Sequence, residues 1–285
     1  MTDRIKKYSA ALGISAVGVC RARLFDELKD KLSVNTPMVP ENIEERINPF
    51  LYLADAKSVV VCLFSYHNGG AGSNLSLYAR GEDYHIVAER KLKELCGILE
   101  GEGYKAKAYC DTGALCDRHL AYLAGLGFIG KNRCLINSDY GSYTFIGYIL
   151  TDAELEESKP LDLSCMNCGE CIRACPGGAL TESGLDSSKC VSYITQKKGT
   201  LSEEEEQILR KSGSVWGCDI CQTVCPHNKA AKLTDIEEFR TNLIESLDLN
   251  MADSNREFKK KYQSRAFSWR GYEVIKRNLK ITEEE

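Results

Sequence analysis

The residues with the clearest capacity for chemistry are cysteines in the second half of the chain. The chain has fourteen cysteines, and eight of them lie between residues 165 and 225. The stretch CMNCGECIRACP has the pattern C-x2-C-x2-C-x3-C-P, and CDICQTVCP repeats it without the first cysteine, a vacancy that Cys190 can fill. In two-cluster ferredoxins the fourth cysteine of each run ligates the other cluster. The spacing therefore predicts two [4Fe–4S] clusters, the first on Cys165, Cys168, Cys171 and Cys225 and the second on Cys190, Cys218, Cys221 and Cys175.

A pair of structural zinc sites is the alternative for these cysteines, because such sites also use C-x2-C. Zinc does not need three closely spaced cysteines and a fourth followed by proline. Soft thiolates suit iron–sulfur clusters, and because the first residues do not resemble a secretory signal we expect a reducing compartment and no disulfides. Two clusters transfer single electrons. Since a ferredoxin alone is far shorter than 285 residues, the remaining residues must hold an electron acceptor or dock partners.

A second group of reactive residues lies in YCDTGALCDRH (109–119). Asp-Thr-Gly is the active-site triplet of aspartic proteases, but these enzymes need two carboxylates sharing one proton, and the chain has one copy. A metal site on Cys110, Cys116 and His119 lacks a fourth local ligand. The third interpretation is that one carboxylate, Asp111, serves chemistry supplied by the rest of the chain. Its structural alternative is an Asx-turn before a helix.

The elements that must position these residues alternate between strand and helix patterns in the first 155 residues. An amphipathic helix is expected to lead into a strand within residues 1–20, and further helices at 85–104 and 117–127. Strands are expected at 58–66, 104–110 and 143–151. GLGFIG (125–130) matches a dinucleotide fingerprint but follows a helical segment instead of a strand, so we expect its glycines to end that helix.

This organisation predicts a mixed fold, α+β or α/β, with three parts. Residues 1–155 form an α/β domain, 156–230 a two-cluster bacterial-ferredoxin-like domain, and 231–285 a basic helical C-terminal segment. Residues 255–280 contain nine Lys or Arg against two Glu, interleaved with aromatic residues, on a chain of net charge −4. That contrast indicates a polyanion partner, the alternative being a solvated helix face. No apolar run is long enough to span a membrane, so a cytosolic protein is expected.

The order of these blocks resembles that of the tRNA epoxyqueuosine reductases, which are cobalamin-dependent iron–sulfur enzymes. The resemblance is carried by ARGEDYH (79–85), DTGALCDRHLAYLAGLGFIGKN (111–132), YGSYTFIGYILT (140–151), both cysteine runs, KCVSYITQKKGTL (189–201), NREFKKKY (255–262) and SWRGYEVIKRN (268–278). Reductive dehalogenases share the combination of clusters and corrinoid but not these blocks. Two departures stand out. Many members continue into a helical-repeat domain, so a short form is expected here, and Arg80 occupies a position where an aromatic residue is common.

The resemblance implies reduction of an epoxide on a modified base in the tRNA anticodon loop, which gives queuosine. The clusters would pass electrons to bound cobalamin. Asp111 matches the family's proposed proton donor, and burial against the corrin would raise its pKa. Asp117 is interpreted as a residue at a helix N-terminus. The expected partners are tRNA and an external electron donor such as flavodoxin or ferredoxin, with no membrane, for a monomer.

The resemblance also implies binding residues. For cobalamin it points to Arg46, Asp111, Leu135, Ile146, Ser192 and Asp219, and for tRNA to Lys198, Thr200, Leu201, Trp269 and Arg270. No histidine is expected as an axial ligand, although His85 is the first to test among His67, His85, His119 and His227. Two other functions stay open: a corrinoid-dependent reductase of a small molecule, and a ferredoxin-type electron carrier that docks to a larger complex.

Overall fold

The computed structural model describes residues 1–32, 40–70 and 72–283, and these form two compact units. The first unit comprises residues 1–65, 87–130 and 134–165, and the second comprises 66–86, 131–133 and 166–285. This division differs from the expected boundaries at 155/156 and 230/231. Residues 66–86 fold with the cysteine-rich segment, and the C-terminal segment 231–285 belongs to that same unit.

The first unit is built on a four-stranded antiparallel sheet. Its strand order is β1 (Ala16–Arg21), β2 (Ser58–Ser65), β6 (Thr144–Thr151) and β3 (Ala106–Cys110). All eight residues of β2 are buried. The continuous apolar run SVVVCLFS is typical of a strand covered on both faces.

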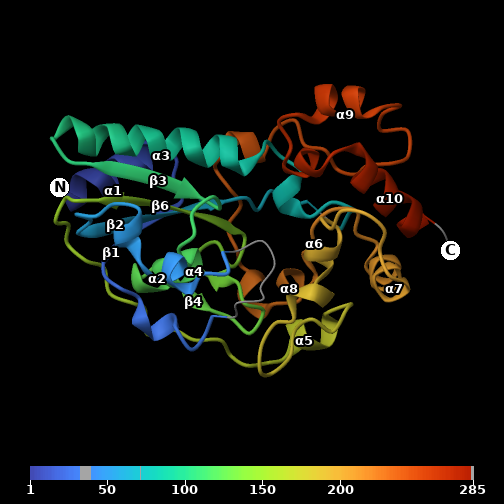
Figure 1. The fold of residues 1–285 in the computed structure, drawn as a ribbon, viewed down its shortest axis with the longest axis horizontal. Coiled ribbons are helices and arrows are strands. Elements are labelled where there is room, and N and C mark those ends of the chain that lie inside the picture. The colour runs from blue at the N-terminus through green and yellow to red at the C-terminus, as the bar shows by residue number, and fades with distance from the viewer. Residues whose placement is uncertain (33–39, 71, 284–285) are drawn as a thin grey trace. The chain divides into compact units, whose positions relative to one another are not determined.

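Helices cover both faces of this sheet (Figure 1). On one face Val59, Val61 and Leu63 share a core with Leu120 and Ala121 of α4 (Asp117–Leu123). On the other face lies α3 (Tyr84–Gly101), whose Leu92 leaves no room for a side chain at position 147 of β6. The other α-helices in the described part of this unit are α1 (Thr2–Ala11) and α2 (Ile43–Ile47). The predicted mixed fold is confirmed, with antiparallel pairing throughout this sheet.

The glycines of GLGFIG end α4, as the sequence predicts. Gly125 follows the helix with a φ of +71°, and a Cβ there would lie 2.4 Å from the carbonyl oxygen of Lys159. Both constraints favour glycine at a helix C-terminus. The chain then forms a short antiparallel pair, β4 (Phe128–Ile129) with β5 (Leu135–Ile136).

The second unit contains short helices around two apolar cores. One core includes Trp216, Phe258, Phe267 and Leu279, and the other includes Ile194, Leu201 and Leu209. Its α-helices are α5 (Glu170–Ala174), α6 (Val191–Ile194), α7 (Glu203–Ser212), α8 (Ile220–Thr223), α9 (Asn255–Tyr262) and α10 (Tyr272–Glu283).

Short 3-10 helices complete both units, at Asp26–Leu28, Pro49–Leu51, Leu77–Ala79, Ser187–Lys189, Pro226–Asn228, Glu237–Phe239 and Ala266–Arg270. A capping box of Ser202 and Glu205 begins α7, satisfying two backbone amides that the helix leaves unpaired. Within the described ranges, no helix has the length and apolar character needed to cross a membrane.

Candidate active site and cluster-ligating residues

The Asp-Thr-Gly triplet forms a tight turn directly after β3. Asp111 is exposed and has a φ of +56°, a left-handed conformation that aspartate tolerates better than most residues. Gly113 is required by packing, because a Cβ at that position would lie 1.9 Å from the hydroxyl oxygen of Tyr148. The triplet is therefore a turn built against Tyr148.

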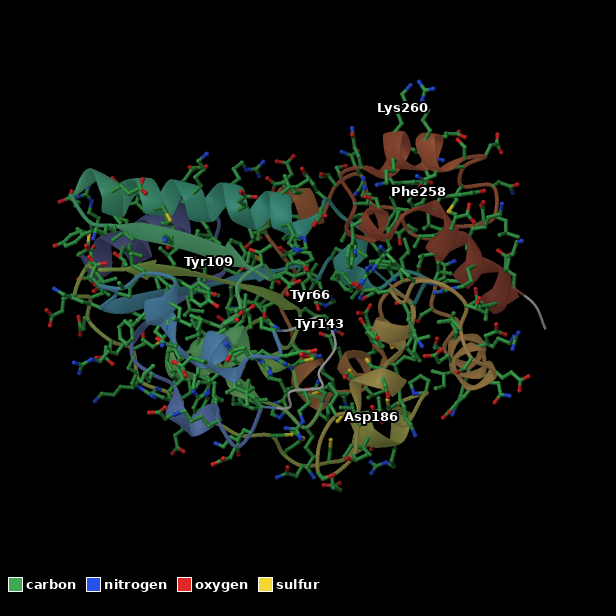
Figure 2. All side chains as sticks on the ribbon, in the orientation of Figure 1. Tyr66, Tyr109, Tyr143, Asp186, Phe258 and Lys260 are labelled. Carbon is green, nitrogen blue, oxygen red and sulfur yellow. The ribbon has the colours of Figure 1, made fainter. Side chains whose placement is uncertain are left out.

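Tyr148 on β6 organises the residues that follow this turn. The residue is 1% exposed, its ring stacks on that of Tyr109 at a centroid distance of 5.2 Å, and its oxygen accepts a hydrogen bond from the backbone of Leu115. Burial, and secondarily the charge of Asp117, raises the pKa of the Tyr148 hydroxyl, so it stays neutral at physiological pH. Figure 2 labels Tyr109, which lies on the neighbouring strand β3.

Asp117, the first residue of α4, has an unusual environment for a helix N-terminus. Its Oδ1 atom is shielded from solvent and lacks a hydrogen-bond partner among the described residues, although the residue as a whole is only partly buried. Burial raises the pKa of its carboxyl to about 8, with a further contribution from the negative charge of Asp111 and opposition from Arg118. Asp117 lies at the N-terminus of α4, as the sequence predicts. The burial of its carboxyl oxygen was not predicted, although the buried neighbours Leu115 and Leu120 are a sequence signal for it.

The side chains of the zinc interpretation, Cys110, Cys116 and His119, make other contacts. Among the described residues, no three His, Cys, Asp or Glu side chains are arranged as a metal-binding group, the predicted cluster cysteines included. Instead, His119 Nε2 lies 2.8 Å from Glu27 Oε1. Cys110 is buried, and Cys116 packs against the core of the first unit.

The predicted cluster cysteines of the second unit lie in short helices and in the segments on either side of them. Cys171 lies in α5 and Cys221 in α8, and these two helices contact each other. Cys190 immediately precedes α6. Burial raises the pKa of Cys218 to about 12, with smaller contributions from Cys190 and Cys175.

Cys175 and Cys190 therefore each lie within electrostatic range of Cys218, and the three residues are among the four ligands predicted for the second cluster. Soft sulfur donors with this spacing in the sequence fit an iron–sulfur cluster.

The residues expected to bind cobalamin are distributed over both units. In the first unit, Leu135 and Ile146 contact the same core as Tyr148, and Arg46 of α2 is buried. In the second unit, Ser192 lies in α6, and Asp219 accepts hydrogen bonds from the Ser76 hydroxyl and from the Leu77 amide, the latter at 2.7 Å. The Asp219 carboxylate thus ties residues 76–77 to the loop between Cys218 and α8.

His85, the first histidine to test as an axial ligand, contacts two residues near it in the sequence, Asp83 and Tyr84. His85 Nδ1 lies 2.8 Å from Asp83 Oδ1, and the His85 ring stacks on Tyr84 at a centroid distance of 4.0 Å. Burial lowers the pKa of His67, which favours its neutral form.

The residues expected to contact tRNA include an exposed tryptophan paired with a partly buried arginine. The Trp269 side chain is 52% exposed, and the Arg270 guanidinium lies 3.7 Å from the centre of its ring. In the other block Lys198 and Thr200 are exposed, whereas Leu201 is 6% exposed and packs in a core of the second unit. A contact from position 201 would therefore come from its backbone.

Sequence reasoning missed the residue that holds the Lys198 loop. Arg277 of α10 donates hydrogen bonds to the carbonyl oxygens of Lys197 and Gly199, at 2.8 and 2.5 Å. The neighbouring Asn278, fully buried, donates to Thr195 and Val215 carbonyls. The basic charges of SWRGYEVIKRN are the sequence signal, but their use in loop anchoring depends on the tertiary fold.

The basic stretch at 255–262 forms an amphipathic helix, α9. Phe258 is fully buried, while Lys259, Lys260 and Lys261 are exposed. Figure 2 shows Lys260 pointing away from the helix into solvent. The helix thus presents a row of cations on the surface of the second unit.

Two family models match the chain. Residues 164–228 match the 4Fe-4S double cluster binding domain, and residues 46–112 match "Epoxyqueuosine reductase QueG, DUF1730". The first match spans all eight predicted cluster cysteines and confirms the two-cluster domain; which cysteine serves which cluster stays a prediction.

Relatives match nearly the whole chain. An epoxyqueuosine reductase of Lactococcus garvieae is 36% identical over 98% of this chain and 85% of its own length. The structure of the Streptococcus thermophilus epoxyqueuosine reductase superposes with a TM-score of 0.90 at 32% identity, covering 99% of this chain and 80% of that one. A crystal structure of an epoxyqueuosine reductase with an epoxyqueuosine-modified tRNA-Tyr stem loop gives 0.89 at 32% identity, covering 98% and 80%.

A more distant structure, a reductive dehalogenase with a B12-dependent mechanism, is 19% identical with a TM-score of 0.50 and covers 84% of this chain and 32% of its own, which shows a shared fold alone. The identity of the nearer relatives over almost the full length is a much stronger observation. The chain belongs to the epoxyqueuosine reductase family.

Proposed function

We propose that this protein reduces epoxyqueuosine in tRNA to queuosine, with two [4Fe–4S] clusters and cobalamin as its cofactors. The observation that carries the proposal is the 36% identity to an epoxyqueuosine reductase over 98% of the chain, which includes both cysteine runs and the Asp111 turn. A solved family member bound to a modified tRNA stem loop supports the substrate.

The donor sets of the two units fit these cofactors. The eight cysteines would supply the thiolates for both clusters, and Cys175 and Cys190 lie near enough to Cys218 to raise the pKa of its thiol. For cobalamin, Ile146 is partly exposed beside Thr144, whose buried hydroxyl oxygen lacks a hydrogen-bond partner in the described ranges. Such an edge of apolar and polar groups suits an amide-bearing ring, with Arg46, Leu135, Ser192 and Asp219 as further contacts. When bound, cobalamin supplies the reactive reduced metal.

Asp111 is the proton donor in this proposal. Its side chain is exposed on a turn that Gly113 and Tyr148 hold in place, so it can reach a substrate. In the solved Bacillus subtilis epoxyqueuosine reductase, the catalytic loop of an aspartate is swung out of the active site. An exposed turn at a strand end is consistent with such a loop, and a positioned acid contributes about 10²–10⁴-fold to a rate.

The second unit carries the candidate tRNA contacts. Trp269 offers a stacking face for an unpaired base and Arg270 a cation for phosphate, while Lys198 and Thr200 extend from the loop that Arg277 anchors. An external donor such as flavodoxin or ferredoxin would reduce the clusters of a cytoplasmic monomer.

Reconstitution with iron and sulfide under anaerobic conditions, followed by a cobalamin titration, tests the cofactor assignment. Failure to take up the corrinoid would contradict both enzyme hypotheses and favour an electron carrier. The loaded protein is then given epoxyqueuosine-containing tRNA and a chemical reductant, and queuosine is measured by mass spectrometry. We expect conversion; a fully loaded protein that leaves the tRNA unchanged would contradict the tRNA substrate and favour a small molecule.

A further inference from the structure

We propose that Arg277 is a positioning residue for tRNA: it fixes the backbone of the loop at residues 197–200, so that Lys198 and Thr200 are presented to the nucleic acid. The inference deepens the proposed function and rests on it, because it concerns how the enzyme holds that substrate. It also makes a separate statement about the free protein, namely that the conformation of this loop depends on a side chain of α10.

The loop runs between two residues that an apolar core of the second unit holds. Ile194 is fully buried, Leu201 is 6% exposed, and both pack in the same core. Lys198, Gly199 and Thr200 are exposed, and the Gly199 φ of +78° is a left-handed conformation that favours glycine. Core packing therefore fixes the two ends of the loop, whereas its middle, which carries the expected tRNA contacts, needs another support.

Arg277 supplies that support through two peptide groups. Its Nη1 atom donates hydrogen bonds to the carbonyl oxygens of Lys197 and Gly199, at 2.8 and 2.5 Å. A trans peptide group is planar, so its N–H points opposite to its C=O. Holding these two carbonyls therefore turns the backbone amides of Lys198 and Thr200, both exposed residues, away from Arg277. Backbone amides and the side chains of lysine and threonine are common donors to phosphate oxygens, so the loop is suited to the tRNA backbone.

All three nitrogens of the Arg277 guanidinium are engaged within the second unit. Nη1 donates to the two loop carbonyls, and Nε and Nη2 donate to Oδ1 of Asn278 at 3.1 and 2.8 Å. The planar fork of an arginine suits this set of partners, whereas the single ammonium of a lysine does not. Arg277 therefore acts on tRNA through the loop and is not itself a phosphate ligand.

Asn278 ties the same helix to the segments that carry predicted cluster ligands. This residue is fully buried, and its Nδ2 atom donates to the carbonyl oxygens of Thr195 and Val215 at 2.7 and 2.9 Å. Thr195 ends α6, which Cys190 precedes, and Val215 lies three residues before Cys218. Two neighbouring residues of α10 thus hold the loop and the second-cluster segments in one frame.

The expected effect of this support is on affinity. A loop that is ordered in the free protein does not lose its backbone entropy when the substrate binds, and the complex is favoured to that extent. Such a contribution is the same for bound substrate and for the transition state. Loss of Arg277 should therefore raise KM for tRNA and leave kcat nearly unchanged.

The first test compares tRNA binding by the wild-type holoenzyme and by Arg277→Met, which keeps the aliphatic stem but lacks the donors. Lys280→Met is the matched control, because Lys280 is an exposed cation of the same helix and both variants lose one positive charge. With an epoxyqueuosine-modified tRNA stem loop, Arg277→Met should raise Kd and KM about tenfold, and Lys280→Met should match the wild type. Iron content and cobalamin affinity should be equal in all three proteins.

A double-mutant cycle distinguishes action through the loop from a direct contact with phosphate. If Arg277 acts through Lys198 and Thr200, Arg277→Met should weaken binding less in a protein that already carries Lys198→Ala and Thr200→Ala than in the wild type. Fully additive effects would overturn the inference. If Arg277→Met loses iron, Arg277→Lys replaces it in the cycle, since it keeps the charge without the planar fork and should bind the stem loop with an intermediate Kd.

Limited proteolysis with trypsin gives a readout that needs no tRNA. Cleavage after Lys197 and Lys198, followed by mass spectrometry, should be faster in Arg277→Met than in the wild type and Lys280→Met, because a loop released from its anchor fits a protease more readily. Equal cleavage rates, or equal stem-loop affinity of Arg277→Met and a wild type that binds, would contradict the inference alone. A loaded wild type that does not bind the stem loop would contradict the proposed function.

Discussion

The cysteine-rich segment (164–228) and the Asp111 loop (111–117) both carry chemistry, but they reveal it in different ways. The cysteines act through residue type and spacing, because four thiolates bind a cluster wherever the chain allows them to meet. The two aspartates have identical side chains, yet one is exposed on a turn and the other is enclosed beside Tyr148. Ligand sets can thus be recognised in a sequence, whereas proton affinity is set by surroundings.

The largest effect is expected from the loss of one predicted cluster cysteine. Replacing the isolated ligand in Cys190→Ala should remove the second cluster, because a cubane that loses one thiolate is poorly held. Iron content should fall by roughly half, and reduction of bound cofactor should cease. Cys20→Ala, at a buried cysteine of the first unit outside the motifs, is the control. Full iron content in Cys190→Ala would show that another residue completes the cluster.

Asp111→Asn tests the proposed role of the exposed aspartate, Asp111, as proton donor. Turnover should fall by about 10²-fold or more, since the amide cannot donate the proton, while iron content and cobalamin affinity stay unchanged. Asp152→Asn is a matched control, because Asp152 also follows the last residue of a strand. Product formation at the wild-type rate by Asp111→Asn would remove Asp111 from the reaction.

The pH dependence of the free energy of unfolding tests the other aspartate of the loop, Asp117. The folded-state pKa of Asp117, about 8, lies above the unfolded value of about 3.9, so folding requires uptake of a proton between these pH values. The contribution of Asp117 to the free energy of unfolding of the wild type therefore falls as pH rises from about 4 to about 8. Asp117→Asn should be more stable than the wild type at pH 7, by on the order of a few kcal/mol, and equal to it near pH 4.

Melting temperatures of both proteins across this pH range provide the measurement, with Asp3→Asn, at an exposed aspartate in the first turn of α1, as the reference variant. A difference between Asp117→Asn and wild type that stays constant with pH would mean that Asp117 is ionised in the folded protein.

The smallest expected effect concerns the tRNA surface. Trp269→Ala should weaken binding of the stem loop by about tenfold, through loss of one stacking face. Arg270→Ala should reduce the dependence of log K on log salt by about one unit of slope. Leu233→Ala, at another exposed apolar residue of the second unit, should leave affinity unchanged. Equal affinity of Trp269→Ala and wild type in a fluorescence anisotropy titration would exclude stacking there.

Periodicity in the sequence was enough to predict the positions of most helices and strands of the first unit. β2, β3, β6, α3 and α4 lie within a few residues of their predicted spans, because each buries an apolar pattern of its own period. Strand partners could not be predicted in this way. The antiparallel order β1-β2-β6-β3 depends on contacts between segments far apart in sequence, and so does the assignment of residues 66–86 to the second unit.

By itself, the sequence determined the two-cluster domain, the mixed fold and the position of Asp111 ahead of a helix, since these depend on local spacing and pattern. The tertiary structure alone decided that Gly113 must be glycine, that Arg277 anchors the Lys198 loop, and that burial raises the pKa of Asp117. The physical reason is common to all three. Steric room, hydrogen-bond partners and desolvation are properties of neighbours in space, and the chain brings those neighbours together only on folding.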